Sequence, residues 1–178
     1  MSDPRQELAY AAALHIGVHE VGHNGGPQVE RWLAVTGHKA GTPWCAAFVS
    51  AQIKDVCDGR KIAAPLCSAG AVDLYHRAKR AGLAVIYPDG DLTKVRPGML
   101  WIRATSADDA KAARAGKSVH GHVGIVTKTP PGAATFETVE GNTNAAGSRE
   151  GDAVAAKTHR WDHPYTVAFV DPFSKVAP

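Results

Sequence analysis

The chain has 178 residues, 44% of them hydrophobic, which is enough to bury one core around a fixed site, so we predict a single domain over residues 1–178. Lysine and arginine exceed aspartate and glutamate only by 20 to 17, which is too little for the dense basic surface of a nucleic-acid-binding protein. No apolar run has the length of a membrane span or of a signal peptide. We therefore expect a soluble monomer made in the cytoplasm, without membrane insertion or nucleic-acid binding.

The first half of the chain has helical patterns. Asp3 followed by Pro4 is a typical helix start, and Gly59 suits a left-handed helix end. Ser68 is a suitable N-cap. The predicted helices run from Asp3 to Ile16, from Val29 to Gly37, from Thr42 to Gly59 and from Ser68 to Gly82. The third of these places Cys45 in its first turn.

The second half changes to strand patterns. Short runs of β-branched and aromatic residues, separated by Pro, Gly, Asp and Asn, occupy residues 83–87, 99–103, 122–128, 134–140 and 166–170. Residues 104–117, rich in alanine and charge, are expected to form a helical excursion between two strands. Helices followed by strands predict an α+β fold in which the helix carrying Cys45 packs on one face of an antiparallel sheet.

Four residues have the types that a cysteine hydrolase needs. Cys45 at a helix N-terminus is favoured as a thiolate, because the unpaired N–H groups there stabilise the anion. His122 opens one predicted strand and Glu140 closes the next, so antiparallel pairing would bring a base and the group that orients it together. Asn142 follows two residues later and is expected to add a hydrogen bond at the same edge of the sheet.

Three segments carrying these residues resemble the motifs of the CHAP family of cysteine, histidine-dependent amidohydrolases and peptidases. They are PWCAAFV (43–49), GHVGIV (121–126) and EGNTN (140–144), preceded by RPGMLW (96–101), in which Met99 stands where relatives carry an aspartate. The resemblance covers roughly residues 20–171. It implies a papain-like fold, N-terminal helices on an antiparallel sheet, in an enzyme of phage lysins and bacterial wall hydrolases.

The resemblance also implies the activity. Cys45 would be the nucleophile, His122 the general base and then acid, Glu140 the residue that orients His122, and Asn142 a supporting polar residue. The substrate would be bacterial peptidoglycan, cut at the N-acetylmuramoyl-L-alanine amide or within the stem peptide or cross-bridge, with no cofactor or metal. A phage endolysin released through a holin, or a secreted antibacterial toxin, would fit, and a monomer acting on the cell wall is expected.

Each assignment has an alternative. A cysteine in an amphipathic helix is usually a core residue, and Trp44 is expected to pack beside the site or to line the substrate groove. His120 is the rival base, since strand alternation places it on the face of His122. Asn144 is expected to stabilise a turn. Near the C-terminus, three aromatic or polar residues form either a solvated loop or a substrate contact: His159, Trp161 and His163.

A zinc motif competes with the cysteine hypothesis. Residues 19–23 read His-Glu-Val-Gly-His, the H-E-x-x-H pattern in which two histidines one helical turn apart bind zinc. The extended form of the motif needs a ligand at position 29, where Val29 cannot serve. A zinc metallopeptidase using His19, Glu20 and His23 is therefore the first alternative, and a non-catalytic wall-binding module is the second.

The cysteine count leaves one question open. Cys57 and Cys67 lie ten residues apart and either form a disulfide or are both reduced, with the second option favoured.

Overall fold

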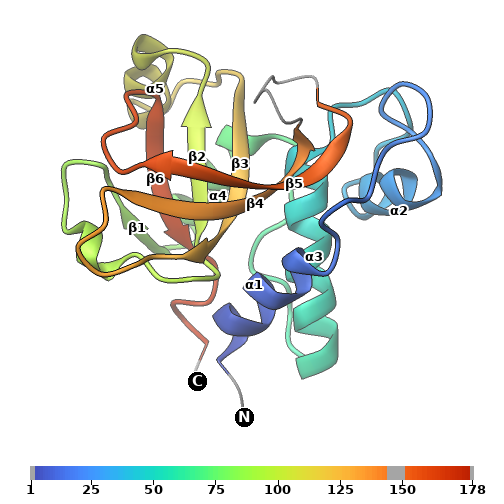
Figure 1. The fold of residues 1–178 in the computed structure, drawn as a ribbon, viewed down its shortest axis with the longest axis horizontal. Helices are drawn as coiled ribbons and strands as arrows, with labels where there is room; N and C mark the ends of the chain where they lie inside the picture. The colour runs from blue at the N-terminus through green and yellow to red at the C-terminus, as the bar shows by residue number, and fades with distance from the viewer. Residues whose placement is uncertain (1–2, 144–150, 177–178) are drawn as a thin grey trace.

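The computed structural model describes residues 3–143 and 151–176 (Figure 1). The α-helices of this part are α1 (Pro4–Ala13), α2 (Pro27–Val35), α3 (Cys45–Arg60), α4 (Ala71–Arg80) and α5 (Ala107–Arg114), with a 3₁₀ helix at Leu92–Lys94. Its strands are β1 (Ala84–Ile86), β2 (Leu100–Ala104), β3 (Gly121–Lys128), β4 (Thr135–Thr143), β5 (Ala153–Arg160) and β6 (Thr166–Asp171).

All four helices predicted in the first half are present, and their ends lie within three residues of the predicted ones. The Asp3 carboxylate caps α1 by accepting from a backbone N–H, as expected. Helix α3 passes through Gly59 and ends with Lys61 in the left-handed conformation at φ 58°. Ser68 does not cap α4, because its hydroxyl accepts from the N–H of Gly70, the residue directly before the helix begins.

The strands form one six-stranded sheet in the order β1-β6-β2-β3-β4-β5, and every neighbouring pair is antiparallel. The five predicted strands and the helical excursion are all found, which confirms the α+β class. Strand β5 was not predicted. Figure 1 shows β4 and β5 running across the direction of β2, β3 and β6, so the sheet is strongly twisted.

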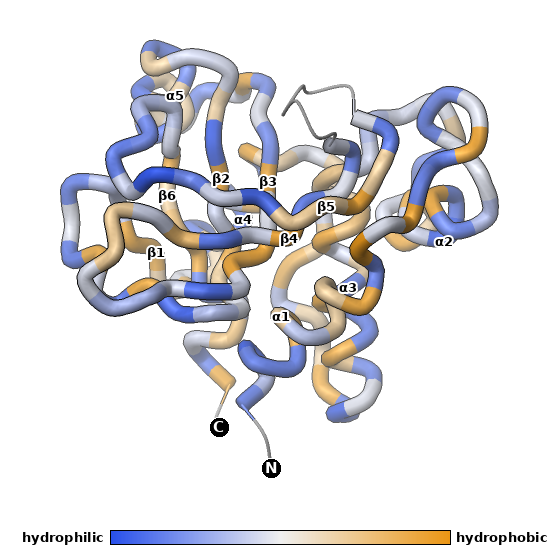
Figure 2. Tube along the Cα trace, viewed as in Figure 1, coloured by the Kyte–Doolittle hydropathy of each residue, from blue (hydrophilic) through white to orange (hydrophobic). Residues whose placement is uncertain are grey.

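The helices and the sheet share the larger of two hydrophobic cores. Val123, Ile125 and Val139 from β3 and β4 pack in it with the buried residues of α1, α3 and α4. Hydrophobic residues are concentrated where α3 meets the sheet (Figure 2). The smaller core contains Trp101 and Phe136, from β2 and β4. No helix among the described residues is both long and apolar enough to cross a membrane.

The pleat of the strands sets which polar residues share a face. Successive side chains of a strand point to opposite faces, so His122 and Gly124 of β3 alternate with the core residues Val123 and Ile125. The β3–β4 register, in which Ile125 pairs with Val139, puts Glu140 on the face of His122. Pairing of the two strands therefore brings together the predicted base, His122, and the residue predicted to orient it, Glu140.

Candidate active site

Cys45 is the first residue of α3, as the sequence predicts, and its side chain is nearly buried, with 7% of the residue exposed. Backbone N–H groups of Ala46 and Val123 and the ring of His122 act on its sulfur. Burial alone would raise the pKa of the thiol, but the charge and hydrogen bond of His122 outweigh it and lower the pKa below the ordinary value. The arrangement favours a thiolate at Cys45.

His122 lies between the sulfur of Cys45 and the carboxylate of Glu140. Its Nε2 is 2.8 Å from Oε2 of Glu140, which leaves Nδ1 to face the thiol. Burial would lower the pKa of the imidazole, yet the neighbouring thiolate and carboxylate raise it to about 9. An imidazolium is therefore stable beside the thiolate near neutral pH.

Glu140 is held by three donors. Its Oε2 accepts from His122, and its Oε1 lies 2.6 Å from both the hydroxyl of Thr138 and Nε2 of His159. The residue is 3% exposed. Burial would raise the pKa of this carboxyl, but the hydrogen bonds and charges of the two histidines lower it far below its usual range, so Glu140 is ionised.

Gly124 makes room for the Glu140 side chain. A Cβ built on Gly124 would lie 2.7 Å from Cγ of Glu140 and 3.1 Å from Cβ of Thr138, and the first of these distances is too short for real atoms. Because three hydrogen bonds hold the carboxylate, Glu140 cannot move aside without losing its bond to His122. A glycine on β3 is thus part of the geometry of the site.

We predict that Gly124→Ala lowers kcat by about 10- to 100-fold, because a shift of roughly 1 Å in a catalytic group can cost that much. The measurement is the rate of substrate cleavage by the folded variant. Gly59→Ala is the matched control: nothing lies within 4 Å of a Cβ there, so this change in the last turn of α3 should leave kcat unaltered. Wild-type kcat in Gly124→Ala would contradict the role given to this glycine.

We also predict a bell-shaped pH profile for kcat/KM. The competent form, thiolate with imidazolium, appears as Cys45 loses its proton, at a pH below the ordinary thiol pKa of 9.0. It disappears as His122 loses its proton near pH 9. Activity should therefore rise with pH, reach a plateau, and fall through an alkaline limb near 9. A profile that keeps rising through pH 10 would argue against the ion pair.

Asn142 is placed near the site, as predicted. It is 3% exposed and has φ 52°, in a part of β4 where the pairing with β5 shifts register between Glu140 and Thr143. The irregular backbone turns Asn142 into the wall of the cleft that contains Cys45. Asn144 lies outside the described residues.

The cleft beside Cys45 has a volume of about 370 Å³ and is built from four segments of the chain. Its walls are His38, Thr42, Pro43, Cys45, Ala69, Gly70, Ala71, Val119, His120, Gly121 and Asn142. A second hollow with Glu20 and His23 shares Pro43 and Asn142 with it. The two hollows thus meet at Pro43 and Asn142, close to Cys45.

His120 lines this cleft as an exposed residue just before β3. No contact of His120 with Cys45 or Glu140 is present, whereas His122 interacts with both. The geometry therefore favours His122 over the rival base.

The prediction that Trp44 contacts substrate finds no support in its position. The side chain is fully buried, stacks on Trp32 with ring centroids 5.3 Å apart, and donates from Nε1 to Glu20 across 2.9 Å. Trp44 therefore packs beside the site, which is the first of the two alternatives given for it. Burial leaves no Trp44 surface for a substrate in this conformation.

The helix that a zinc motif needs is missing at residues 19–23. His19 forms an isolated bridge with Ala153, and His23 is an exposed loop residue. The carboxylate of Glu20 accepts from the Trp44 indole and from the backbone N–H of Asn24. No group of three or more His, Cys, Asp or Glu able to hold a metal ion occurs within residues 3–143 and 151–176.

The three cysteines are all unbridged, which answers the question left open for the second and third. Cys57 is buried in α3 and Cys67 is exposed. Burial and the neighbouring Asp58 raise the pKa of the Cys57 thiol. Only Cys45 combines a helix N-terminus with a histidine.

Sequence reasoning missed the contact of His159 with Glu140. The three C-terminal aromatic or polar residues were expected in a solvated loop or against substrate, but His159 belongs to β5 and reaches Glu140. Trp161 packs on Phe136, and His163 packs edge-on against Trp101. The sequence offers little signal for this contact, because residues 154–160 read as three small or apolar residues followed by four polar ones and do not alternate.

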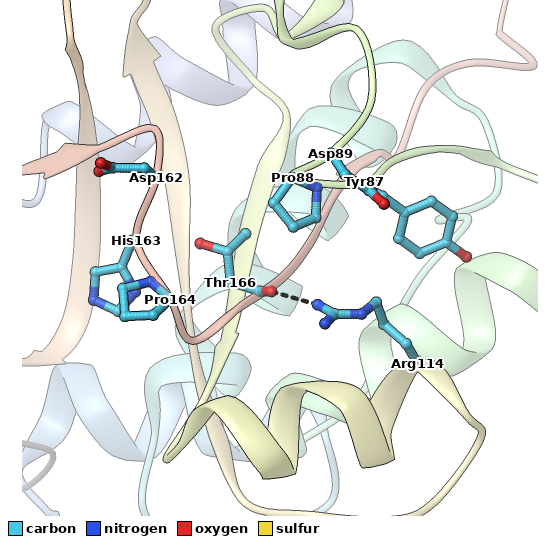
Figure 3. Close-up of a pocket in the computed structure, with 8 residues that line it drawn as sticks. All are labelled: Tyr87, Pro88, Asp89, Arg114, Asp162, His163, Pro164 and Thr166. Carbon is cyan, nitrogen blue, oxygen red and sulfur yellow. Dashed lines mark hydrogen bonds between the residues drawn. The ribbon is translucent and has the colours of Figure 1, made fainter.

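A larger hollow of about 560 Å³ lies elsewhere, between the loop after β1, α5 and the start of β6 (Figure 3). Figure 3 shows Arg114 donating to the backbone carbonyl of Thr166, with His163 and Asp162 on the opposite side. It shares no residue with the Cys45 cleft and contains no nucleophilic thiol. The chemistry of the site therefore belongs to the smaller cleft.

No protein-family model matches this chain, and no curated protein or solved structure is significantly similar to it.

Proposed function

We propose that this chain is a CHAP-like cysteine hydrolase that cleaves an amide bond in the peptide part of bacterial peptidoglycan. The observation that carries the proposal is the buried row of Cys45, His122 and Glu140, with the thiol at a helix N-terminus and in an open cleft. An ion pair that only stabilised the fold would not require a thiol in the wall of a cleft. The helices packed on an antiparallel sheet are compatible with a papain-like arrangement.

In the proposed reaction the Cys45 thiolate attacks the carbonyl carbon of the amide and forms a C–S bond. The electron pair of the carbonyl moves to its oxygen, which the backbone N–H of Cys45 at the helix N-terminus would help to stabilise. The C–N bond then breaks as Nδ1 of His122 passes its proton to the departing amine, leaving a thioester.

Water completes the cycle. It attacks the thioester carbonyl while His122 takes one of its protons, and the C–S bond breaks to release a carboxylic acid and the Cys45 thiolate. Glu140 keeps the imidazole ring oriented in both halves and stabilises its charged form. Every step uses groups of this chain and water, so the proposed chemistry needs no cofactor.

The substrate part of the proposal rests on the motifs in residues 43–49, 121–126 and 140–144, which resemble those of wall hydrolases. Two hollows that share Pro43 and Asn142 beside Cys45 would suit a peptide that extends beyond the scissile bond. The small excess of positive charge favours approach to an anionic polymer. Either the N-acetylmuramoyl-L-alanine amide or a bond of the stem peptide or cross-bridge would be cut, in the role of a phage endolysin or an antibacterial toxin.

The experiment is digestion of purified peptidoglycan, followed by mass spectrometry of the released fragments, in parallel with a thiol alkylator and with a zinc chelator. We expect new amino and carboxyl termini that identify one bond, loss of cleavage after alkylation, and full cleavage with the chelator. Cleavage that resists the alkylator and stops with the chelator would overturn the cysteine mechanism and return His19, Glu20 and His23 to consideration. No new termini from several peptidoglycan chemotypes would remove peptidoglycan as the substrate.

A further inference from the structure

We propose that His159 is a positioning residue of the active site, which fixes the Glu140 carboxylate so that its other oxygen stays aimed at His122. The inference rests on the proposed cysteine chemistry, and it adds a fourth side chain to it. His159 would act only through Glu140 and would touch neither substrate nor nucleophile.

The two oxygens of Glu140 have separate tasks. Oε2 lies 2.8 Å from Nε2 of His122, while Oε1 lies 2.6 Å from Nε2 of His159 and 2.6 Å from the hydroxyl of Thr138. A carboxylate bound through one oxygen can rotate about its last bond, whereas one bound through both cannot do so without breaking a hydrogen bond. His159 and Thr138 together therefore restrict the motion that would separate Glu140 from His122.

The ring of His159 is itself held in place. It packs against Trp101, with centroids 4.0 Å apart and ring planes tilted by 31°, and against Phe136 at 5.6 Å. The Trp101 indole donates to the hydroxyl of Thr166 across 3.1 Å inside the smaller core. Strands β2, β4 and β6 thus support a histidine from β5, and 16% of its side chain is exposed.

Few ionisable groups face this part of the site. Cys45 from α3 and Glu140 from β4 act on His122, and the two histidines act on Glu140. His163, before β6, has its ring centroid 6.3 Å from that of His159. Arg103 from β2 and Asp162 from the loop after β5 act in turn on His163.

Loss of the His159 donor has two opposing effects on His122. Glu140 becomes more basic, which strengthens its bond to the imidazolium, but its Oε1 is then held by the Thr138 hydroxyl alone, so the carboxylate rotates away more easily. Rotation removes the whole charge-assisted hydrogen bond, whereas the change in basicity alters only a fraction of it. The net expectation is a less stable imidazolium and a lower pKa of His122.

The test compares variants that differ in the donor. His159→Phe keeps an aromatic ring against Trp101 and removes the N–H, and His159→Leu is a second loss variant in case phenylalanine does not fit. His159→Gln keeps an N–H donor for Glu140. His163→Gln is the matched control, since His163 also packs on Trp101, with centroids 5.4 Å apart, but does not bond to Glu140.

Two readouts are measured on each folded variant: kcat and KM on soluble peptidoglycan fragments over a range of pH, and the rate of Cys45 alkylation by iodoacetamide over the same range. For His159→Phe we expect kcat about tenfold lower, KM within about twofold, and an alkaline limb displaced about one pH unit downward. His159→Gln should recover kcat to within about threefold, and His163→Gln should match the wild type.

The proposal is overturned if His159→Phe and His159→Leu keep the wild-type kcat and alkaline limb. It is equally overturned if the glutamine variant is as impaired as the phenylalanine one, because a residue needed only for packing gives that result. Alkylation needs no substrate, so it separates this inference from the function. A shifted alkylation profile without any peptidoglycan cleavage would support the role of His159 and overturn the proposed substrate.

Discussion

Cys45→Ala is expected to lower the rate of peptidoglycan cleavage by about 10³-fold or more, to the limit of detection. In the proposed reaction the thiolate forms the covalent bond of the first step, and alanine offers no atom that can replace it. The side chain is small and lies at the first turn of α3, so its loss leaves the surrounding core intact. The measurement is the initial rate of fragment release, with the melting temperature of the variant as the check on folding.

The matched control for this variant is Cys67→Ala. Cys67 is an exposed free thiol that does not contact His122, so its removal should change the rate less than twofold. Loss of activity in both variants would mean that removal of either thiol harms the protein, so the loss in Cys45→Ala would not identify the nucleophile. A Cys45→Ala enzyme as active as the wild type would remove the nucleophile from the mechanism.

His122→Gln is expected to lower kcat/KM by about 10³-fold, because the variant can neither stabilise the thiolate nor protonate the leaving amine. Without the imidazolium, burial dominates at Cys45 and the pKa of its thiol should rise above the ordinary value. Kinetics on peptidoglycan fragments and the pH dependence of Cys45 alkylation measure the two effects separately.

His120→Gln is the control for the base. This residue lines the same cleft two positions earlier but is exposed and lacks the carboxylate partner, so we expect a change of no more than about threefold, mainly in KM. If the effects are reversed, with His120→Gln inactive and His122→Gln active, the assignment of the base is wrong.

Much of the site geometry could be predicted because it depends on a local helix start, on two strand patterns and on the pairing of β3 with β4. The helix start before Cys45 is local. β3 is rich in valine and isoleucine, and β4 contains threonine, phenylalanine and valine, all of them residues that favour strands. Once these two strands pair as neighbours, His122 and Glu140 must meet on one face. The encounter of the two residues therefore follows from strand pattern and pleat alone.

The contribution of β5 could not be predicted in the same way. Its sequence, AVAAKTHR, is dominated by alanine and charged residues with low strand propensity, and it forms a strand because β4 offers it a partner edge. The contact between His159 and Glu140 depends on that pairing. It also depends on the stacking of His159 on Trp101, a residue 58 positions away in the sequence (159 minus 101).

The errors at helix ends have local causes. Ser68 was a reasonable N-cap by residue type, but its hydroxyl donates to Asp73 and accepts from the N–H of Gly70, its backbone N–H donates to the hydroxyl of Ser50, and the helix begins later. At the end of α3, Lys61 adopts the left-handed conformation that glycine was expected to supply. Competition among nearby polar groups decided the first case, and the sequence pattern alone does not show it.

The measurement that tests the central claim most directly is alkylation of the three cysteines of the native protein in one sample, resolved by peptide mass spectrometry at several pH values. Accessibility alone predicts that the exposed Cys67 reacts first and that Cys45, 7% exposed, reacts slowly. Our account predicts the opposite order below pH 7 for a small alkylator, with Cys45 modified first and Cys57 last. Reaction of Cys67 ahead of Cys45 at every pH would contradict the activated thiolate on which the proposed function depends.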